Sequence, residues 1–275
     1  MKIRAVIVFF IVLLFQKGEI AAQTGSIIKP PQPIAYPNVR EADIIWSKRI
    51  WRIIDLREKI NQPLYYPVNE MTNRHSLFDV IKKGITAGEL NVYDPVPSIF
   101  TPDEEFKTKF SFEQAKKTFT REITVMVQDS LGDLSPKTII DTLGPDDIVQ
   151  YQIKEDWFFD KQRSVMDVRI LGIAPVVEIT DEQGEFKGYK TLFWLSFPDS
   201  RNYFSQFRCY NPYNDSEYRT FDEIFEKRLF GSFITQESNV YNRPIAAYAE
   251  GMEALLEAEK IKDDLFKFEQ DMWHY

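Results

Sequence analysis

The amino-terminal apolar run is the feature that most constrains this chain. Lys2 and Arg4 precede the apolar residues 5–15, and the sequence then relaxes into Ala21-Ala22. A basic start, roughly 7–15 apolar residues and a small-residue exit are typical of a secretory signal peptide. The run is too short for a membrane span, which needs about 20 residues. We therefore expect residues 1–22 to be a signal peptide, with a buried amino-terminal strand as the alternative. No cysteine lies near the expected cleavage site, which argues against a lipid anchor.

Export limits how the rest of the chain can be stabilised. Small exported domains usually rely on paired cysteines, but this chain has only Cys209, so its fold must depend on packing. Aromatic residues make up 15% of the sequence and could serve both a core and interfaces. Without residues 1–22, which carry three basic side chains and one acidic one, the net charge moves from −8 to −10. An acidic chain of this kind is a poor candidate for binding nucleic acid.

Residues 23–42 are predicted to form an extended arm. Pro30, Pro31, Pro33 and Pro37 are spaced so that no helix can form, and such spacing favours a polyproline-like conformation. Two interpretations remain open for this segment. It is either a disordered leader or an arm that docks on a neighbouring subunit.

The segment from Asp43 to Ile60 is predicted to be a helix. Its apolar residues Trp46, Ile50, Ile53 and Ile54 recur at the spacing of one helical face. On this interpretation the arginines share the remaining surface with acidic residues.

The remaining pattern predicts an α+β fold, with a strand-rich centre flanked by helices. We expect capped helices after Ser76 and Thr220, and a long carboxy-terminal helix opened by Asn242 and Pro244. The inward stripe of that last helix is expected to contain Ile245, Tyr248, Met252, Leu255, Leu256, Leu265, Phe268 and Met272. Strands are expected at 91–93, 122–127, 165–179 and 189–197. Residues 43–275 are expected to form one body, or two parts (43–96 and 157–275) with an intervening segment 97–156.

No constellation of catalytic residues is evident. His75 and His274 are the only histidines, too few for a histidine-based metal site with helical spacing. Ser26-Ile27-Ile28-Lys29 matches the S-x-x-K spacing of serine acyltransferases, but it lies in the proline-spaced arm, where no helix presents both side chains. We therefore assign no catalytic, cofactor-binding or metal-binding residue, and we expect no cofactor. A pair of carboxylates for glycoside hydrolysis has no local signature, which leaves a periplasmic hydrolase of cell-wall or sugar polymers as the alternative function.

Several segments resemble one known family. They are the stretches 46–59, 168–175 and 220–228, together with the tail from Glu237-Ser238-Asn239 through Asn242-Arg243-Pro244-Ile245 to Asp271-Met272-Trp273-His274-Tyr275. In this order they resemble the GldN/PorN family of gliding-motility and type IX secretion proteins. Residues 97–150 agree least with the family pattern.

The resemblance implies a periplasmic, non-enzymatic scaffold. Family members pair with an outer-membrane lipoprotein, GldK/PorK, assemble with it into large rings, and contact the periplasmic part of the inner-membrane protein GldM/PorM. On this basis the protein would be held at the outer membrane through its lipoprotein partner. The family supplies no catalytic residues to transfer.

The expected partner interface combines the arm with the segment that follows it. Its candidate residues are Pro30, Pro31, Pro33, Arg49, Trp51 and Arg52. Tryptophan and arginine are enriched among the residues that dominate binding energy. The alternative is that Trp46 and Ile50 face the core while the arginines pair with Asp55 and Glu58.

Overall fold

The computed structural model describes residues 32–69, 71, 74–95, 106–128, 134–180, 185–211 and 219–272, with the backbone alone between 122 and 139. The expected signal peptide, Pro30 and Pro31 lie outside these residues. The described residues belong to one compact unit that begins at Pro31.

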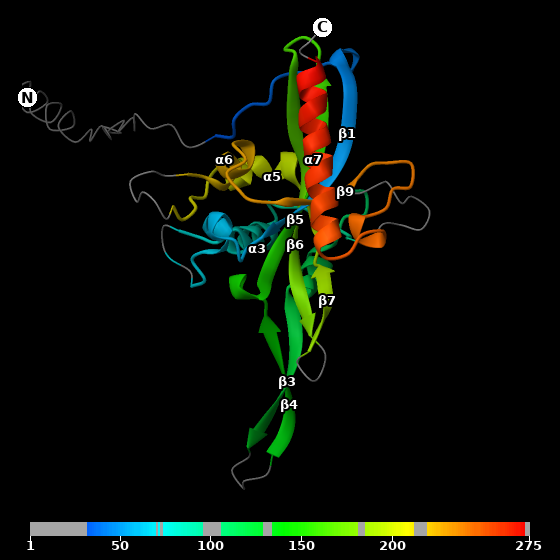
Figure 1. Cartoon of the computed structure of the whole chain (residues 1–275). Helices are drawn as coiled ribbons and strands as arrows, with labels where there is room; N and C mark the ends of the chain where they lie inside the picture. The colour runs from blue at the N-terminus through cyan, green and yellow to red at the C-terminus, as the bar shows by residue number, and fades with distance from the viewer. Residues whose placement is uncertain are drawn as a thin grey trace, which may run out of the picture. The chain divides into compact units, whose positions relative to one another are not determined.

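A seven-stranded antiparallel sheet forms the centre of this unit (Figure 1). Its strand order is β2–β8–β6–β5–β1–β9, and β7 pairs with β6. The strands are β1 (Ile44–Asp55), β2 (Val92–Tyr93), β5 (Ile148–Asp160), β6 (Val165–Thr180), β7 (Phe186–Thr191), β8 (Trp194–Ser196) and β9 (Phe233–Glu237). A separate hairpin pairs β3 (Thr120–Gln128) with β4 (Leu134–Thr142). The α+β class is therefore confirmed, and the sheet joins β1 to strands from later in the chain.

The predicted helix at 43–60 is wrong, because this segment forms the strand β1. Trp46, Ile50 and Ile54 are four residues apart, an even spacing that puts them on one face of a strand as well as of a helix. The many isoleucines favour the strand, because β-branched side chains fit a pleated surface. Long-range pairing decides the outcome. β1 pairs with β5 from Ile44 to Asp55 and with β9 from Ile50 to Ile53.

Among the described helices, α3, α4 and α6 begin at capping side chains. The helix bounds are α2 (Gln62–Tyr65), α3 (Leu77–Ala87), α4 (Phe112–Thr118), α5 (Phe197–Phe204), α6 (Phe221–Glu226) and α7 (Met252–Met272), with short 3₁₀ helices at Glu41–Asp43, Lys59–Asn61, Pro145–Asp147 and Ile245–Ala247. The Ser76 hydroxyl accepts a hydrogen bond from the Asp79 amide, and Thr220 forms a capping box with Glu223. The predicted starts of α3 and α6 are confirmed.

Two hydrophobic clusters hold these elements together. The larger cluster packs α3, α5 and α6 against the sheet, with Phe78, Tyr151 and Phe197 almost fully buried. The smaller one joins α7 to β1 and β9 through Ile50, Ile234, Ile245, Ala258, Ile261 and Leu265. Figure 1 shows α7 running alongside β1.

The long carboxy-terminal helix is confirmed, but part of its predicted inward stripe is wrong. The helix begins at Met252, and Asn242 and Pro244 belong to the loop before it. Met252, Leu255 and Leu256 are 72%, 54% and 64% exposed. Leu265 is buried as predicted, and the predicted Phe268 packs against Trp46 with ring centroids 4.7 Å apart. The other buried positions of the helix, Ala258 and Ile261, were not in the predicted stripe. The first turns of α7 therefore present apolar side chains to solvent.

Candidate partner interface

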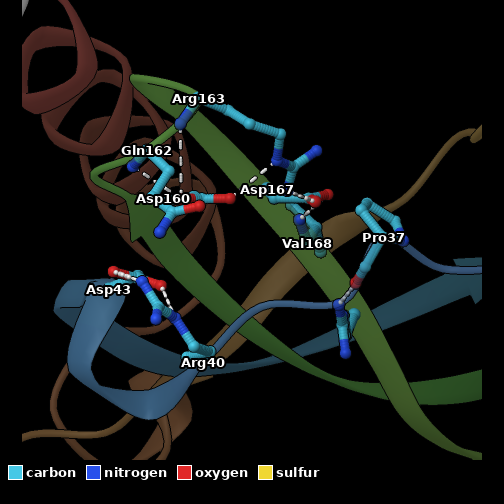
Figure 2. Close-up of polar contacts among 9 residues, drawn as sticks. Pro37, Arg40, Asp43, Asp160, Gln162, Arg163, Asp167 and Val168 are labelled. Atoms are coloured by element: carbon cyan, nitrogen blue, oxygen red, sulfur yellow. Dashed lines mark hydrogen bonds and ion pairs between the residues drawn. The ribbon is translucent and has the colours of Figure 1, made fainter.

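The amino-terminal arm docks on the body of its own chain. The carbonyl of Pro37 accepts a hydrogen bond of 2.5 Å from Nη2 of Arg169 on β6 (Figure 2). The carbonyl of Ile34 accepts one of 2.6 Å from Nη2 of Arg201 on α5. Between these two carbonyls, the half-buried Tyr36 places its ring 4.0 Å from the guanidinium carbon of Arg201 and 5.0 Å from that of Arg169. The arm is thus held by two arginines that contact both its backbone and its one aromatic ring.

Further side-chain contacts hold Arg201 and Arg169 in place. Arg201 is 6% exposed and makes a two-pronged ion pair with Asp222, which is 1% exposed, at 2.7 and 3.2 Å. Glu226 lies 3.4 Å from the same guanidinium. Arg169 stacks on Phe158, with 5.5 Å between the guanidinium carbon and the ring centroid. We call these five residues, Phe158, Arg169, Arg201, Asp222 and Glu226, the arm cradle.

Local sequence explains how α6 supplies the carboxylates. The capping box at Thr220 starts the helix, so Asp222 lies in its first turn, where a negative charge is favoured. Glu226 is four residues further and therefore on the same side. Arg201 extends from α5, which follows β8 directly, so that both helices present charged groups to one place.

Burial and neighbouring charges together shift the pKa values of Tyr36, Glu226 and Arg201. Burial raises the pKa of Tyr36 to about 12, with the positive charge of Arg201 opposing the shift. Burial also raises the pKa of Glu226, again against the effect of Arg201. For Arg201 itself burial acts to lower the pKa, but the hydrogen bond with Asp222 and the neighbouring negative charges raise it overall. The Arg201–Asp222 ion pair therefore lies beneath a tyrosine that stays neutral at physiological pH.

The base of the arm is fixed separately at the β5–β6 turn. Arg40 pairs with Asp43 at 2.8 Å, and the carbonyl of Asp43 accepts a hydrogen bond from the Lys161 amide at 2.9 Å. In the turn itself, Asp160 and Asp167 both bind Arg163 at 2.6 Å (Figure 2). The arm thus has two attachment points, one at residues 34–37 and one at residues 40–43.

The expected interface residues are divided between two surfaces. Of the three prolines, only Pro33 is described, and it is half-buried in the arm. Arg49 binds both carboxylate oxygens of Asp156, at 2.7 and 3.0 Å, and remains about one-third exposed. Trp51 is half-buried, with the ammonium of Lys154 5.2 Å from its ring centroid.

Arg52 differs from these residues because it is only 7% exposed. Its guanidinium donates to the hydroxyl and the carbonyl of Ser232, at 2.9 and 3.0 Å. Burial lowers its pKa, and Glu155 opposes that shift. The alternative interpretation pairs the arginines of this segment with Asp55 and Glu58, and Arg57 does bind Asp55 at 2.6 Å. The contacts described for Arg49 and Arg52 are with Asp156 and Ser232. Trp46 and Ile50 contribute to the core under α7.

An apolar groove of about 380 Å³ lies where β1 and β9 meet the start of α7. Its lining includes Trp51, Phe233, Pro244, Ala254 and Leu255. Next to it the surface carries further exposed apolar side chains, namely Tyr248, Met252 and Leu256. We call this groove and its exposed apolar rim the α7 groove. Sequence reasoning assigned the rim residues to the core, and the excess of apolar positions around α7 was the available signal for a second surface.

Within the described part of the chain, no cluster of three or more His, Cys, Asp or Glu side chains is suited to a metal ion. Cys209, the single cysteine, is buried. No helix among the same residues combines the length and apolarity needed to cross a bilayer.

Comparison with known proteins gives one informative result. No curated protein matches the chain significantly. The family model described as gliding motility associated protein GldN matches residues 39–274, from the base of the arm to the end of α7 and beyond. That match covers most of the sequence, including the strands, the helices and the α7 groove described above. The chain therefore belongs to the GldN family of gliding-motility and type IX secretion components.

Proposed function

We propose that this protein is a periplasmic, non-enzymatic scaffold subunit of the type IX secretion system. It would pair with an outer-membrane lipoprotein of the GldK/PorK type, assemble with it into a large ring, and contact the periplasmic region of a GldM/PorM-type motor protein. The observation that carries the proposal is the α7 groove, a concave apolar surface with exposed apolar neighbours, in a member of a family that is not a known enzyme family.

Exposed apolar surface argues for a protein partner. Met252, Leu255 and Leu256 are three apolar side chains within five residues of one helix, each more than half exposed. Contiguous apolar surface costs free energy in water, at roughly 25 cal/mol per Å². Soluble proteins retain such surface mainly where a partner covers it. We propose that the lipoprotein covers this part of α7.

The periplasmic location is supported by the amino-terminal sequence. The basic start and the short apolar run of residues 1–22 are those of a signal peptide. A lipidated partner can hold an exported protein at a membrane. In this proposal the protein connects the energy source in the inner membrane with export across the outer membrane.

Co-expression tests the proposal most directly. The full chain is produced with the lipoprotein, the complex is isolated through a tag on the lipoprotein, and its mass and shape are measured by light scattering and electron microscopy. We expect co-isolation and ring-shaped particles. A discrete monomer that ignores the lipoprotein would contradict the scaffold, as would substrate turnover abolished by changing one acidic side chain.

Variants on α7 locate the contact surface. Changing both Leu255 and Leu256 to Glu adds charge to the exposed apolar rim without touching the buried positions of the helix. We expect a loss of lipoprotein capture with an unchanged helical content. Lys262→Glu is the matched control, since Lys262 is an exposed residue of the same helix, with 57% of its side chain accessible. Equal capture by all variants would remove α7 from the interface.

Arg49 and Trp51 form the second part of the proposed interface. Arg52 is buried beside Ser232 and would support this surface from below. Reversing the charge of Arg49 alone would place a carboxylate against Asp156. The exchange of Arg49→Asp with Asp156→Arg keeps an ion pair while moving the positive charge. If Arg49 binds the partner, the exchange weakens capture, and if it only pairs internally, capture is preserved.

A further inference from the structure

We infer that the edge of β9 in the α7 groove binds an extended strand of the lipoprotein partner, which continues the central sheet. The inference rests on the proposed function, because it states the form in which that partner occupies the groove. The bound strand carries a short apolar run with lysine or arginine beside it.

The backbone of β9 provides the first part of this site. β9 is the last strand in the order of the central sheet, and β1 is its one neighbouring strand among the described residues. In an antiparallel pair only alternate residues bond to the neighbour, so the other amide and carbonyl groups of an end strand point outward. Along Phe233–Glu237 these outward groups can bond to an added strand. Sheet edges of this kind bind extended peptides.

The α7 groove runs over this edge of the sheet. Ile50 and Ile234 pack under α7. The adjacent residues in the two strands, Trp51 and Phe233, therefore point to the opposite face, and both line the groove. Ile245 packs in the cluster under α7 and lines the groove as well. The lining thus comes from both faces of the sheet, and these faces meet at the edge of β9.

The opposite wall of the groove leaves room for a backbone. Its lining residues, from the loop before α7 and from the first turns of the helix, include the small residues Gly251 and Ala254. The space beside Gly251 is open. Small residues let another backbone approach closely. An extended segment can therefore lie between the edge of β9 and the start of α7.

The lining predicts the side chains of the added strand. Successive residues of a strand point to opposite sides. On one side they meet Trp51 and Phe233, and on the other they meet Ile245, Ala254 and Leu255. Because both sides are apolar, the added strand should be apolar at consecutive positions, as strands buried on both faces are. Its length should be similar to the five residues of β9.

The charge beside the groove favours a basic flank on this strand. Glu250 and Glu253 directly precede the lining residues Gly251 and Ala254, and both glutamates are exposed. The guanidinium of Arg243, in the loop before α7, lies against two tyrosine rings. Complementary charges at the rim of an interface steer the partner and fix its register. Lysine or arginine next to the apolar run complements the two glutamates.

Backbone methylation of a bound peptide tests the binding mode. The full chain is applied to overlapping peptides that span the lipoprotein, and the affinity of each bound peptide is measured by fluorescence anisotropy. We expect binding by a peptide with an apolar run beside lysine or arginine. A methyl group on a backbone nitrogen removes that donor, so methylation at alternate positions should weaken binding at least tenfold. Methylation at the positions between them should have little effect, because their amides point away from β9.

Two variants of the full chain locate the bound strand. Ala246 lines the groove and is exposed, so Ala246→Arg fills the groove with a long side chain without removing a core contact. Ala247→Arg is the matched control, because Ala247 is exposed in the same 3₁₀ helix and lies outside the lining. We expect Ala246→Arg to weaken peptide binding and lipoprotein capture at least tenfold, and Ala247→Arg to leave both nearly unchanged. Circular dichroism checks that both variants are folded.

A second pair of variants tests the basic flank. Glu253→Lys should weaken binding of the basic peptide several-fold at low salt and less at high salt, because salt screens exposed charges. Asp263→Lys makes the same change at an exposed position further along α7 and should have little effect.

Four results would overturn the inference. They are an array without any binding peptide, a loss on methylation that does not alternate, equal capture by the two arginine variants, and a chain that is dimeric alone and monomeric after Ala246→Arg. The last result would assign the edge of β9 to a second copy. Each of these leaves the scaffold function standing when the unchanged chain captures the lipoprotein. Failure of the unchanged chain to capture it contradicts the scaffold function itself.

Discussion

The arm cradle and the α7 groove are both docking surfaces, but they are built in opposite ways. The cradle uses buried charge, with Arg201 and Asp222 almost inaccessible to water, and a segment of the chain itself fills it. The groove uses apolar side chains, and neighbours such as Met252 and Leu256 remain largely exposed. The cradle is thus already occupied within the subunit, whereas the apolar side chains beside the α7 groove remain exposed to water.

This difference predicts where mutations act. When a buried ion pair loses one member, the other charge is left buried without its partner. Mutations in the cradle should therefore lower the free energy of unfolding. Exposed apolar side chains contribute little to the stability of the folded monomer. Mutations in the α7 groove should therefore affect the binding of a partner more than folding. Stability measurements on the isolated protein should respond strongly to the cradle and weakly to the groove.

The largest effect is expected for Asp222→Ala. This change leaves the guanidinium of Arg201 buried beneath Tyr36, with Glu226 as its remaining acidic partner among the described residues. Loss of one member of a buried pair typically lowers the free energy of unfolding by about 3–5 kcal/mol. Urea denaturation followed by circular dichroism measures the change.

The matched control is Asp141→Ala. Asp141 binds Arg121 at 2.9 Å, but both side chains are more than 40% exposed. Exposed pairs of this kind contribute about 0–1 kcal/mol. Equal destabilisation by the two substitutions would mean that burial does not distinguish the cradle from ordinary surface pairs.

Tyr36→Ala should have an intermediate effect. It removes a ring that contacts two guanidinium groups, interactions that contribute roughly 0.5–2 kcal/mol each depending on burial. Because the arm is a terminal segment, we expect its release without unfolding of the sheet. Limited proteolysis should then cleave near residues 38–39 faster than in the unchanged chain. Ile34→Ala, which retains the carbonyl contact of residue 34, is the control and should leave the cleavage rate nearly unchanged.

The sequence predicted the helices better than the strand β1, because helices depend on local signals and β1 depends on distant pairing. The helices α3 and α6 and the length of α7 were accessible because capping and helical spacing are local signals. The spacing of Trp46, Ile50 and Ile54 fits both the helical period of about 3.6 residues and the strand period of two, which is why β1 is predicted wrongly as a helix. Its pairing with β5, about a hundred residues later, decides between them.

The arm cradle shows the limit of local reasoning most clearly. An extended proline-spaced arm is predicted at 23–42, and in its described part residues 32–40 belong to no helix or strand, whereas Glu41 and Ala42 begin a 3₁₀ helix. The arm cradle was not predicted, because Arg169, Arg201 and Asp222 come from three separate elements and none of these elements carries a distinguishing motif. The expected interface combines the arm prolines 30, 31 and 33 with Arg49, Trp51 and Arg52, and the signal for the last three was the enrichment of Trp and Arg in interfaces. Arg52 proves buried, and only Trp51 and Arg52 line the α7 groove.

A smaller effect on stability is expected in the α7 groove. Leu256→Ala truncates a side chain that is 64% exposed, and exposed substitutions usually change stability by less than about 0.5 kcal/mol. On the same helix, Ile261→Ala truncates a side chain that is 6% exposed and should cost about 2–5 kcal/mol. Thermal or urea unfolding of the two variants measures the difference. A large loss for Leu256→Ala would mean that the helix contributes this residue to folding and not to a partner.

The smallest effect concerns Glu226 and its dependence on pH. Burial raises the pKa of Glu226 above its ordinary value of 4.5, so the folded protein binds a proton there more readily than the unfolded chain does. This group therefore contributes stability below about pH 4 that is lost as the pH rises through its raised pKa. Glu226→Gln, which stays neutral, should match the unchanged chain in acid and be slightly more stable at neutral pH. Asp160→Asn should show the opposite sign, because the hydrogen bond from Arg163 lowers the pKa of Asp160, and its contribution is present above the ordinary carboxyl range and lost in acid. Urea unfolding between pH 4 and pH 8 measures both variants. A loss of stability in Glu226→Gln at neutral pH would mean that the attraction of Arg201 exceeds the cost of burying a second carboxylate beneath the arm.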